Sequence, residues 1–435
     1  MPSSDSLHAA WLGVIADDVT GATDLAGYVA RSGVSTLQFF GVPGRDVELP
    51  EGVECVIIAL KSRSIAPDLA VEQSLAAQEW LAARGVRRTY FKYCSTFDST
   101  PRGNIGPVAD VLADRVGETS VIVAPSAPEN GRTVYQGKLF VWSQTLDESP
   151  LKDHPLNPMR DADLPRLLGA QSAETIGLIP WQVVSRGAGA VKDALAGEAA
   201  TGNRLVVVDA LTDDDLDTNA HAALERRLVT GSAGLAAAMA RVWRGRHGGA
   251  HRPIVPAGSA VVISGSCSAA TQRQVESYRE THPSFVVDPV AIANGAPVVE
   301  DAVRFAQAAP EGSAPLIYST ADPSEVTRSQ EALGVERAAS LVEGALGEIA
   351  RRLRESGTRR FVIAGGETSG AIVDALHVDA ILIGDEVAPG VPWTVSTADD
   401  PVALVLKSGN FGDVGFFEDA LDRMSAPQDR STPAG

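Results

Sequence analysis

The fold class is decided by one stretch of sequence, Gly13-Val14-Ile15-Ala16-Asp17-Asp18-Val19-Thr20-Gly21-Ala22-Thr23-Asp24. A short apolar run with the character of a buried strand ends at two adjacent carboxylates, and a helical pattern then runs to Gly33. Open α/β sheets place polar groups in this way at the carboxyl ends of their strands, where such folds bind ligands. A single Asp before a helix is expected as its N-cap. Two adjacent ones favour a functional role for Asp17 or Asp18.

Length and composition indicate a two-domain globular protein. The chain has 435 residues, 44% of them hydrophobic and 21% charged, and it exceeds the size at which a single core stops growing. The absence of an 18-residue apolar run argues against a membrane span, and residues 1–8 lack the pattern of a signal peptide. Three scattered cysteines (Cys55, Cys94 and Cys267) favour a reducing cytoplasm over a disulfide framework.

The formal net charge of −18 disfavours nucleic acid as a partner, because binding to its phosphates requires basic stripes that the sequence lacks. Small anionic ligands are not excluded, since local basic residues and backbone N–H groups bind them whatever the global charge.

Strand-like and helical patterns alternate along the chain. Strands are predicted at 53–60, 88–93, 119–125, 176–181 and 205–209 in the first half, with a hairpin at 131–142, and at 260–264, 285–288, 316–320, 360–364 and 402–407 in the second. A stretch rich in Gly, Pro and basic residues near 244–258 has no periodicity and indicates a linker. We therefore predict an N-terminal domain (1–245), a linker (246–259) and a C-terminal domain (260–435). Both domains are expected to be α/β, with mainly parallel sheets covered by helices and the active site in the cleft between them.

Polar clusters follow the predicted strands of the first half. They comprise Asp17 and Asp18, then Ser62 and Arg63, then Lys92, and finally the segment from Thr96 to Asn104. This set suits a small polyhydroxylated anion, with Arg and Lys for a carboxylate and Asp and Asn for hydroxyls. Turn formation alone accounts for Ser99 or Pro101, but it does not account for a lysine at the end of an apolar strand.

The second half has three Gly/Ser/Thr turns at strand-to-helix junctions. They are Ser264-Gly265-Ser266-Cys267-Ser268, Ala364-Gly365-Gly366-Glu367-Thr368-Ser369-Gly370 and Ser408-Gly409-Asn410-Phe411-Gly412. Clustered backbone N–H groups and helix N-termini bind phosphates. We therefore predict a nucleotide site formed by Ser264, Ser266, Gly366, Glu367, Thr368, Ser369, Gly409 and Asn410.

Other common motifs are missing. Residues 131–139 lack the spacing and the final Ser/Thr of a P-loop, and no Gly-x-Gly-x-x-Gly follows a strand. The seven histidines (8, 154, 221, 247, 251, 282 and 377) show no metal-ligand spacing, so no protein metal site is predicted. Cys94 and Cys267 have no base nearby in the sequence and are not expected to be nucleophiles.

These motifs together resemble the four-carbon acid sugar kinase family, once catalogued as a domain of unknown function, over nearly the whole chain. The resemblance rests on residues 16–24, 92–100, 103–106, 265–268, 366–370, 389–393 and 406–412. Within the family, Tyr-Cys-Ser-Thr-Phe-Asp-Ser-Thr (93–100), Gly-Ser-Cys-Ser (265–268) and Pro-Gly-Val-Pro-Trp (389–393) look most like the 3-oxo-tetronate 4-kinase branch. D-threonate and D-erythronate kinases are the alternative.

The resemblance implies that the N-terminal domain binds the acid sugar and the C-terminal domain binds ATP, with Mg²⁺ bridging the phosphates. We predict that Arg63 or Lys92 pairs with the sugar carboxylate, because these residues lie just past a strand or at its end. The full set of predicted substrate ligands is Thr20, Asp24, Ser62, Arg63, Lys92, Thr96, Ser99 and Asn104. Candidate catalytic bases are Asp17, Asp18 and Asp98, and the first two are favoured. Adjacent residues of an extended chain point to opposite sides, so only one of Asp17 and Asp18 is expected to face the reacting hydroxyl. A homodimer is left open.

Two other classes of function remain. A non-catalytic sugar-acid binding protein would require neither the paired carboxylates nor three phosphate-type turns. An aldolase or dehydratase would use Lys92 as a Schiff-base lysine or Asp17 as a base, and release of ADP on turnover distinguishes a kinase from it.

Overall fold

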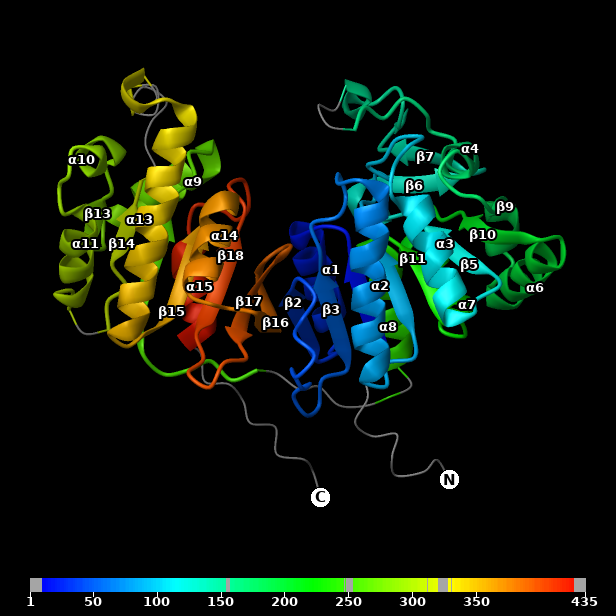
Figure 1. Cartoon of the computed structure of the whole chain (residues 1–435), viewed down its shortest axis with the longest axis horizontal. Coiled ribbons are helices and arrows are strands. Elements are labelled where there is room, and N and C mark those ends of the chain that lie inside the picture. The colour runs from blue at the N-terminus through cyan, green and yellow to red at the C-terminus, as the bar shows by residue number, and fades with distance from the viewer. Residues whose placement is uncertain are drawn as a thin grey trace. The chain divides into compact units, whose positions relative to one another are not determined.

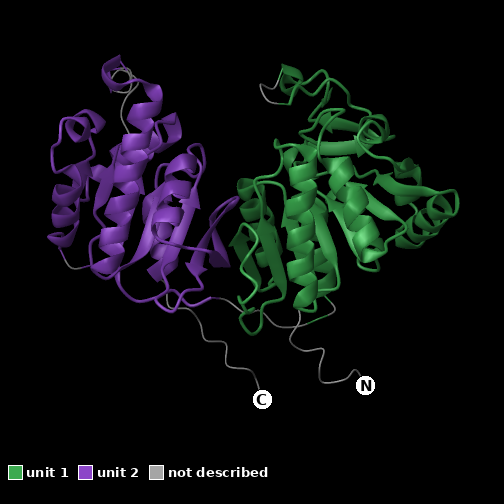
Figure 2. Ribbon diagram, in the orientation of Figure 1, with its two compact units in different colours: residues 1–251 green, residues 252–435 purple. Residues whose placement is uncertain are grey.

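The computed structural model describes residues 10–153, 157–245, 247, 253–310, 312–319, 328–329 and 331–425. The chain forms two compact units, residues 1–251 and 252–435 (Figure 2). The predicted linker spans this division, and its residues 246 and 248–252 lie outside the described residues. So do residues 1–9, His154, His251 and the predicted strand end at Thr320.

Unit 1 contains a parallel sheet whose strands read as short apolar runs. Its order is β2-β3-β1-β4-β11-β5-β10-β9. The strands are β1 (Leu12–Ala16), β2 (Thr36–Phe40), β3 (Cys55–Ala59), β4 (Thr89–Lys92), β5 (Val121–Ala124), β9 (Thr175–Ile179), β10 (Asn203–Val208) and β11 (Leu228–Gly231). Near-continuous burial along these strands is typical of parallel sheets that helices cover on both faces.

The helices of unit 1 form two packed groups. They are α1 (Val19–Arg31), α2 (Pro67–Ala83), α3 (Ile105–Val116), α4 (Leu164–Gly169), α5 (Trp181–Val184), α6 (Ala188–Ala200), α7 (Asp213–Ala223) and α8 (Ala233–Arg244). Helix α2 packs on α3, and both lie in front of the sheet in Figure 1, whereas α8 packs on α1 and α7. A small antiparallel sheet of β6 (Arg132–Tyr135), β7 (Lys138–Val141) and β8 (Gln144–Thr145) includes the predicted hairpin.

The strand order of unit 1 places a topological switch point at β1. From β1 the chain runs to β2 and β3 on one side, and it then returns to β4 on the other side of β1. Open α/β sheets bind ligands beyond the carboxyl ends of the strands at such a point. The residues that follow β1, β3 and β4 are therefore the first place to look for a site.

Unit 2 contains a second, mostly parallel sheet in the order β13-β14-β12-β15-β18-β17-β16. The strands are β12 (Ser259–Ser264), β13 (Ser284–Val286), β14 (Leu316–Tyr318), β15 (Thr358–Ala364), β16 (Ala380–Ala388), β17 (Val391–Ser396) and β18 (Ala403–Lys407). Only the pairings of β17 with β16 and β18 are antiparallel in the described part of this sheet. The helices are α9 (Ala269–Arg279), α10 (Pro289–Ala293), α11 (Val298–Gln307), α13 (Val335–Glu355), α14 (Gly366–Ala375) and α15 (Phe416–Ser425).

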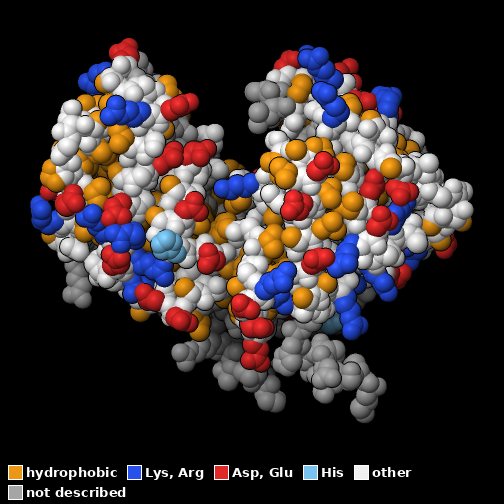
Figure 3. Space-filling view, viewed as in Figure 1, with side chains coloured by type: hydrophobic (Ala, Val, Ile, Leu, Met, Phe, Trp, Pro, Cys, Tyr) orange, Lys and Arg blue, Asp and Glu red, His pale blue; other side chains and the backbone are white. Residues whose placement is uncertain are grey.

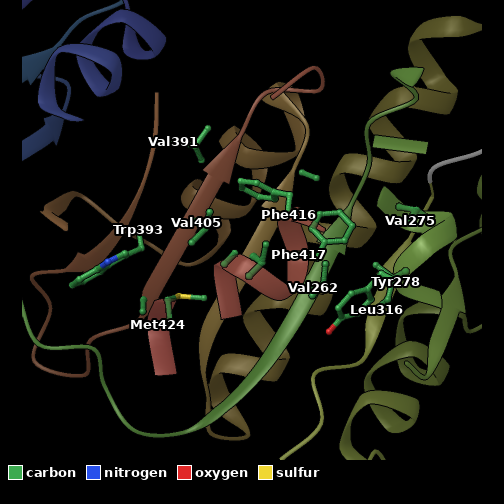
Figure 4. Packing of buried hydrophobic residues seen from close by; sticks show 14 of the residues in the cluster. Val262, Val275, Tyr278, Leu316, Val391, Trp393, Val405, Phe416, Phe417 and Met424 are labelled. Carbon is green, nitrogen blue, oxygen red and sulfur yellow. The ribbon is translucent and has the colours of Figure 1, made fainter. Parts of the chain in front are cut away.

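The core of unit 2 lies between the sheet and the pair of helices α9 and α15 (Figure 4). Tyr278 and Phe417 meet edge to face with ring centroids 5.7 Å apart, and both rings are buried among strand residues such as Val262 and Val405. This packing fixes α9 and α15 relative to the end of β18, which matters for the loop between β18 and α15.

The predicted fold class, α/β with mainly parallel sheets covered by helices, is confirmed. Several details were missed: β2, β11 and the hairpin of β16 and β17, in which Gly390 has a φ of +76°. The predicted strand at 285–288 is shorter, because Asp288 caps α10 and Pro289 begins it. The predicted turn at 364–370 is mostly helical, since α14 begins at Gly366.

In the described residues no helix is long and apolar enough to cross a membrane. Cys55, Cys94 and Cys267 are free thiols. On the face shown in Figure 3, basic and acidic side chains are interspersed over both units.

Candidate active site

Three strand ends of unit 1 are joined through the backbone of Asp17. The Asp17 N–H donates to Lys92 O at the end of β4 (3.1 Å), and Asp17 O accepts from the N–H groups of Ser62 (2.9 Å) and Arg63 (3.1 Å) beyond β3. Segments that are distant in the sequence therefore deliver their polar side chains to one place at the switch point.

Arg63 is the centre of these side chains. Its Nε and Nη2 donate to the two carboxylate oxygens of Asp17 at 2.9 and 2.8 Å, a bidentate pair, and Nη2 also donates to Asp18 Oδ1 at 2.5 Å. Its Nη1 lies 3.4 Å from Asp98 Oδ2, the longest of the four contacts. Lys92 Nζ donates to Asp18 Oδ1 at 3.2 Å. We call Asp17, Asp18, Arg63, Lys92 and Asp98 the acceptor cluster.

The expectation that Asp17 and Asp18 point to opposite sides is wrong, because one guanidinium contacts both carboxylates. The extended strand ends at Ala16, and Asp18 is already the N-cap of α1, with its Oδ2 accepting from Gly21 N at 3.1 Å. The backbone of Asp18 is still extended, with φ −147° and ψ 154°. The alternation of a strand therefore does not decide which groups the two carboxylates meet, because Nη2 of Arg63 contacts both of them.

Gly21 is required for the close approach of Lys92 to the start of α1. Lys92 is only 4% exposed, and a Cβ at Gly21 would lie 1.7 Å from its Nζ. An ammonium near a helix N-terminus is unfavourable for the helix dipole. The adjacent Asp18 carboxylate offsets this repulsion and fixes the lysine.

The two adjacent carboxylates have opposite pKa shifts. Burial raises the pKa of Asp17, although the hydrogen bonds from Arg63 and the charges of Lys92 and Arg63 act against it. Burial also disfavours the charged form of Asp18, but the charges of Lys92 and Arg63 outweigh it and lower the pKa of Asp18. The pKa of Arg63 is raised: burial opposes its charge, but Asp17 and Asp18 more than compensate. Environments that separate two carboxylates in this way are typical of acid–base sites.

The side-chain amide of Asn104 contacts the protein backbone. Its Nδ2 donates to the carbonyls of Ser62 (2.7 Å), Arg63 (3.2 Å) and Ile65 (3.0 Å), so the amide group fixes the loop that carries Arg63. Ser62 is buried, and its backbone is held by Asp17 and Asn104. A direct role for either residue on the substrate stays a prediction.

The segment after β4 lines the same region. Buried Thr96 has its Oγ1 3.0 Å from Cys94 Sγ, and Ser99 Oγ accepts from Gln171 Nε2 at 3.0 Å. Asn157, which the sequence did not single out, donates to Asp98 Oδ1 at 3.1 Å. Asn157 and Gln171 lie in segments without strand periodicity, and no local signal marked them.

Thr20 and Asp24 lie on α1. Thr20 is exposed in the first turn, and no recorded contact in the described chain joins it to the acceptor cluster. Asp24 is half-buried one turn later, where its charge raises the pKa of Tyr28 in addition to the larger effect of burial. Their predicted roles remain untested.

In unit 2 the three turns follow β12, β15 and β18, which are neighbours in the sheet, and they lie together. A Cβ at Gly265 would lie 2.1 Å from Thr368 Oγ1, and one at Gly365 would lie 3.2 Å from Ser266 N. A Cβ at Gly409 would lie 2.6 Å from Ser266 Oγ. Glycines therefore permit the close approach of the three turns to one another.

The predicted nucleotide residues divide between backbone and side-chain positions. Ser264 is buried at the end of β12, and Ser266 Oγ accepts from Ser268 N at 3.2 Å. Gly366, Glu367, Thr368 and Ser369 form the first turn of α14, whose free N–H groups favour an anion. Ser369 Oγ is buried without a hydrogen-bond partner in the described structure. Gly409 and exposed Asn410 follow β18.

These features fit the phosphates of a nucleotide, because a helix N-terminus, glycine turns and an orphaned hydroxyl converge at one sheet edge. No group of three or more His, Cys, Asp or Glu side chains suited to a metal ion occurs in the described residues.

Comparisons with known proteins assign different ligands to the two halves of the chain. A model of a sugar-binding N-terminal domain matches residues 12–239, and a model of a nucleotide-binding C-terminal domain matches residues 261–417. The chain is 49% identical to a 3-oxo-tetronate kinase of Burkholderia multivorans, over 94% of this chain and 96% of the relative. A 3-oxo-tetronate kinase of Pseudomonas fluorescens is 47% identical, over 96% and 98% of the two chains.

The same fold is found in a solved structure of a Haemophilus influenzae protein, with a TM-score of 0.90 and 42% identity over 95% of this chain and 100% of that one. Fold, site and comparisons thus define a protein with a sugar-binding N-terminal half and a nucleotide-binding C-terminal half. More narrowly, the chain belongs to the four-carbon acid sugar kinase family, and the resemblance found in its motifs is confirmed.

Proposed function

We propose that this chain is an ATP-dependent kinase that phosphorylates the 4-hydroxyl of a four-carbon sugar acid, with 3-oxo-tetronate as the substrate. The observation that carries the proposal is the similarity to proteins named 3-oxo-tetronate kinase, which extends at 42–49% identity through both units. D-threonate and D-erythronate are the alternative acceptors.

The acceptor cluster supports binding of a polyhydroxylated acid. Three carboxylates and two cations give the cluster a net charge of −1 when all are ionised. The carboxylates suit hydroxyl groups, but an additional carboxylate from the substrate requires a free donor. Arg63 Nη1 supplies it, because its 3.4 Å contact with Asp98 is the weakest of the guanidinium contacts. In this proposal the sugar carboxylate replaces Asp98 on Arg63, and Asp98 turns to a sugar hydroxyl.

Asp17 is the proposed catalytic base. A base for an alcohol must accept a proton as the new bond forms, and a raised pKa assists this. Asp17 meets the requirement, whereas Asp18 has a lowered pKa and is committed to the cap of α1. The bidentate pair with Arg63 holds the Asp17 carboxylate in a single orientation.

The first turn of α14 and the turns at Gly265 and Gly409 would hold the ATP phosphates through backbone N–H groups. Mg²⁺, when bound, neutralises phosphate charge, and kinases hold it largely through the phosphates and water rather than a protein cage.

The test is a coupled ADP-release assay with the full chain, ATP, Mg²⁺ and a panel of 3-oxo-tetronates, threonates and erythronates. We expect ADP release that depends on the acid, with the largest kcat/KM for a 3-oxo-tetronate. Binding of an acid with no ADP release would instead indicate the non-catalytic binding protein. The cytoplasmic location and the homodimer stay predictions, the latter to be measured by light scattering.

A further inference from the structure

The loop between β18 and α15, residues 408–413, has most of its carbonyl groups turned into the domain. Lys407 Nζ donates to Ser408 O and Gly409 O, each at 3.2 Å, and to Thr271 Oγ1 at 2.9 Å. Thr271 Oγ1 in turn donates to Gly409 O at 2.8 Å, and Ser268 Oγ also donates there. One loop carbonyl thus accepts from three side chains.

Gln274 donates hydrogen bonds to the carbonyl groups in the second half of the loop. Its Nε2 donates to the carbonyls of Phe411 (3.1 Å), Gly412 (3.1 Å) and Asp413 (2.7 Å). Gln274 is 1% exposed on α9, a helix held in place by the Tyr278–Phe417 core. Of the six loop carbonyls, only that of Asn410 lacks a recorded contact with these side chains in the described structure.

The inward carbonyls determine where the loop N–H groups point. In a planar trans peptide the C=O and the following N–H are antiparallel, so an inward carbonyl places the next N–H on the opposite side. The N–H groups of Gly409, Asn410 and Gly412 therefore face away from Lys407 and Gln274. No partner is recorded for these three amides in the described parts of the chain. Successive N–H groups on one side of a loop form a site for an anion.

Lys407 carries a buried positive charge without a carboxylate contact in the described residues. It is 1% exposed, and the acceptors recorded for its ammonium in the described chain are two carbonyls and a hydroxyl, with the Phe416 ring centroid 5.7 Å away. A buried charge without a counter-charge is costly. A bound anion on the far side of the same loop would offset that cost.

We propose that Lys407 and Gln274 are positioning residues of the nucleotide site: they hold the carbonyls of residues 408–413 inward so that the loop N–H groups bind a nucleotide phosphate. The inference rests on the proposed function for the identity of the anion. Lys407 also contributes its positive charge behind the loop, whereas Gln274 acts through geometry alone.

The test measures binding of ATP and of adenosine to the full chain by calorimetry. Lys407→Met keeps the length of the side chain and removes the ammonium, and Gln274→Glu keeps the shape and removes the donors. Controls are Lys192→Met, on the surface of α6, and Gln307→Glu, at the exposed end of α11. We expect the Kd for ATP to rise about tenfold or more in both loop variants, with adenosine and acid-sugar affinities within about twofold of the parent and both controls unchanged.

A folded variant with the parent's ATP affinity, or one that loses adenosine and ATP affinity equally, would overturn the proposal. Hydrogen exchange on the parent chain tests the proposal without any variant, so it remains decisive if the variants fail to fold. ATP should slow hydrogen exchange in a peptide covering residues 408–415, and adenosine should not; equal protection by both also refutes it. Failure of the kinase assay with intact ATP binding and loop protection would reject the proposed function and leave this inference standing.

Discussion

Replacement of Arg63 by alanine tests the acceptor cluster most directly. The guanidinium makes four charge-assisted contacts to three carboxylates, and its side chain is 21% exposed, compared with 7% for that of Asp17. Arg63→Ala leaves the Asp17 carboxylate buried without its principal partner and removes the proposed ligand of the sugar carboxylate. Both effects should weaken acid-sugar binding and leave the nucleotide turns of unit 2 intact.

The magnitude follows from the burial of the pair. Breaking a fully buried ion pair costs about 3–5 kcal/mol, whereas an exposed pair contributes about 0–1 kcal/mol. The partly exposed Arg63 lies closer to the first case, so we expect a loss of about 2–4 kcal/mol in acid-sugar binding. This corresponds to a roughly 30- to 1000-fold rise in KM for the acid.

The assay is the steady-state release of ADP with each substrate varied in turn. Arg166→Ala is a matched control, because Arg166 forms the same bidentate pair with Asp161 at the surface, with a side chain that is 68% exposed. For Arg166→Ala we expect no change in the KM for the acid sugar or for ATP. For Arg63→Ala we expect the KM for the acid sugar to rise and the KM for ATP to stay unchanged. An unchanged acid KM in a folded Arg63→Ala protein would refute the role of Arg63.

Much of the fold was predictable because the local signals agreed with the tertiary structure. Apolar runs that end in polar turns marked β1, β3, β4, β12, β15 and β18, and these strands carry the candidate sites. Of the strands that were missed, β2 and β11 are only five and four residues long, and β16 and β17 form an antiparallel hairpin. The run at β11, Leu228–Gly231, was missed although Ser232 follows it directly and caps α8. The Pro-Gly pair at 389–390 was interpreted as part of a family motif, so the turn that joins β16 and β17 was not predicted.

The site was predictable in its residue types but not in its contacts. A lysine at the end of an apolar strand was the reason for predicting a role for Lys92. Lys407 also ends an apolar strand, but no role was predicted for it from the sequence. Asn104 was predicted to be a substrate ligand, and that role stays a prediction. Its amide, however, holds three backbone carbonyls. Sequence separation conceals such a role, because the partners of Asn104 lie about 40 positions earlier in the chain.

Three further predictions follow from single residues. Asp17→Asn should lower kcat by about 10²–10⁴-fold with little change in KM, whereas Asp18→Asn and Asp98→Asn should affect chiefly KM; a near-normal kcat in Asp17→Asn would transfer the base role to another carboxylate. Asn104→Asp, which replaces the donor by an acceptor, should raise the acid KM and not the ATP KM, and equal effects on both would indicate general unfolding. The last prediction concerns stability, because burial lowers the pKa of Lys407 from 10.5 to about 8. The unfolded chain then binds more protons than the folded one between these values, so the contribution of Lys407 to the free energy of unfolding rises with pH from about 8 to 10.5, by about 3 kcal/mol in total. Burial raises the pKa of Tyr90, Tyr93 and Tyr278 above the usual value of 10, so these side chains add their own pH dependence in alkaline solution. The difference between the parent and Lys407→Met in urea unfolding cancels this effect, because both proteins contain the same tyrosines. The free energy of unfolding of the parent should therefore rise relative to that of Lys407→Met between about pH 8 and 10.5. A difference in unfolding free energy that does not change with pH would show that burial does not lower the pKa of Lys407.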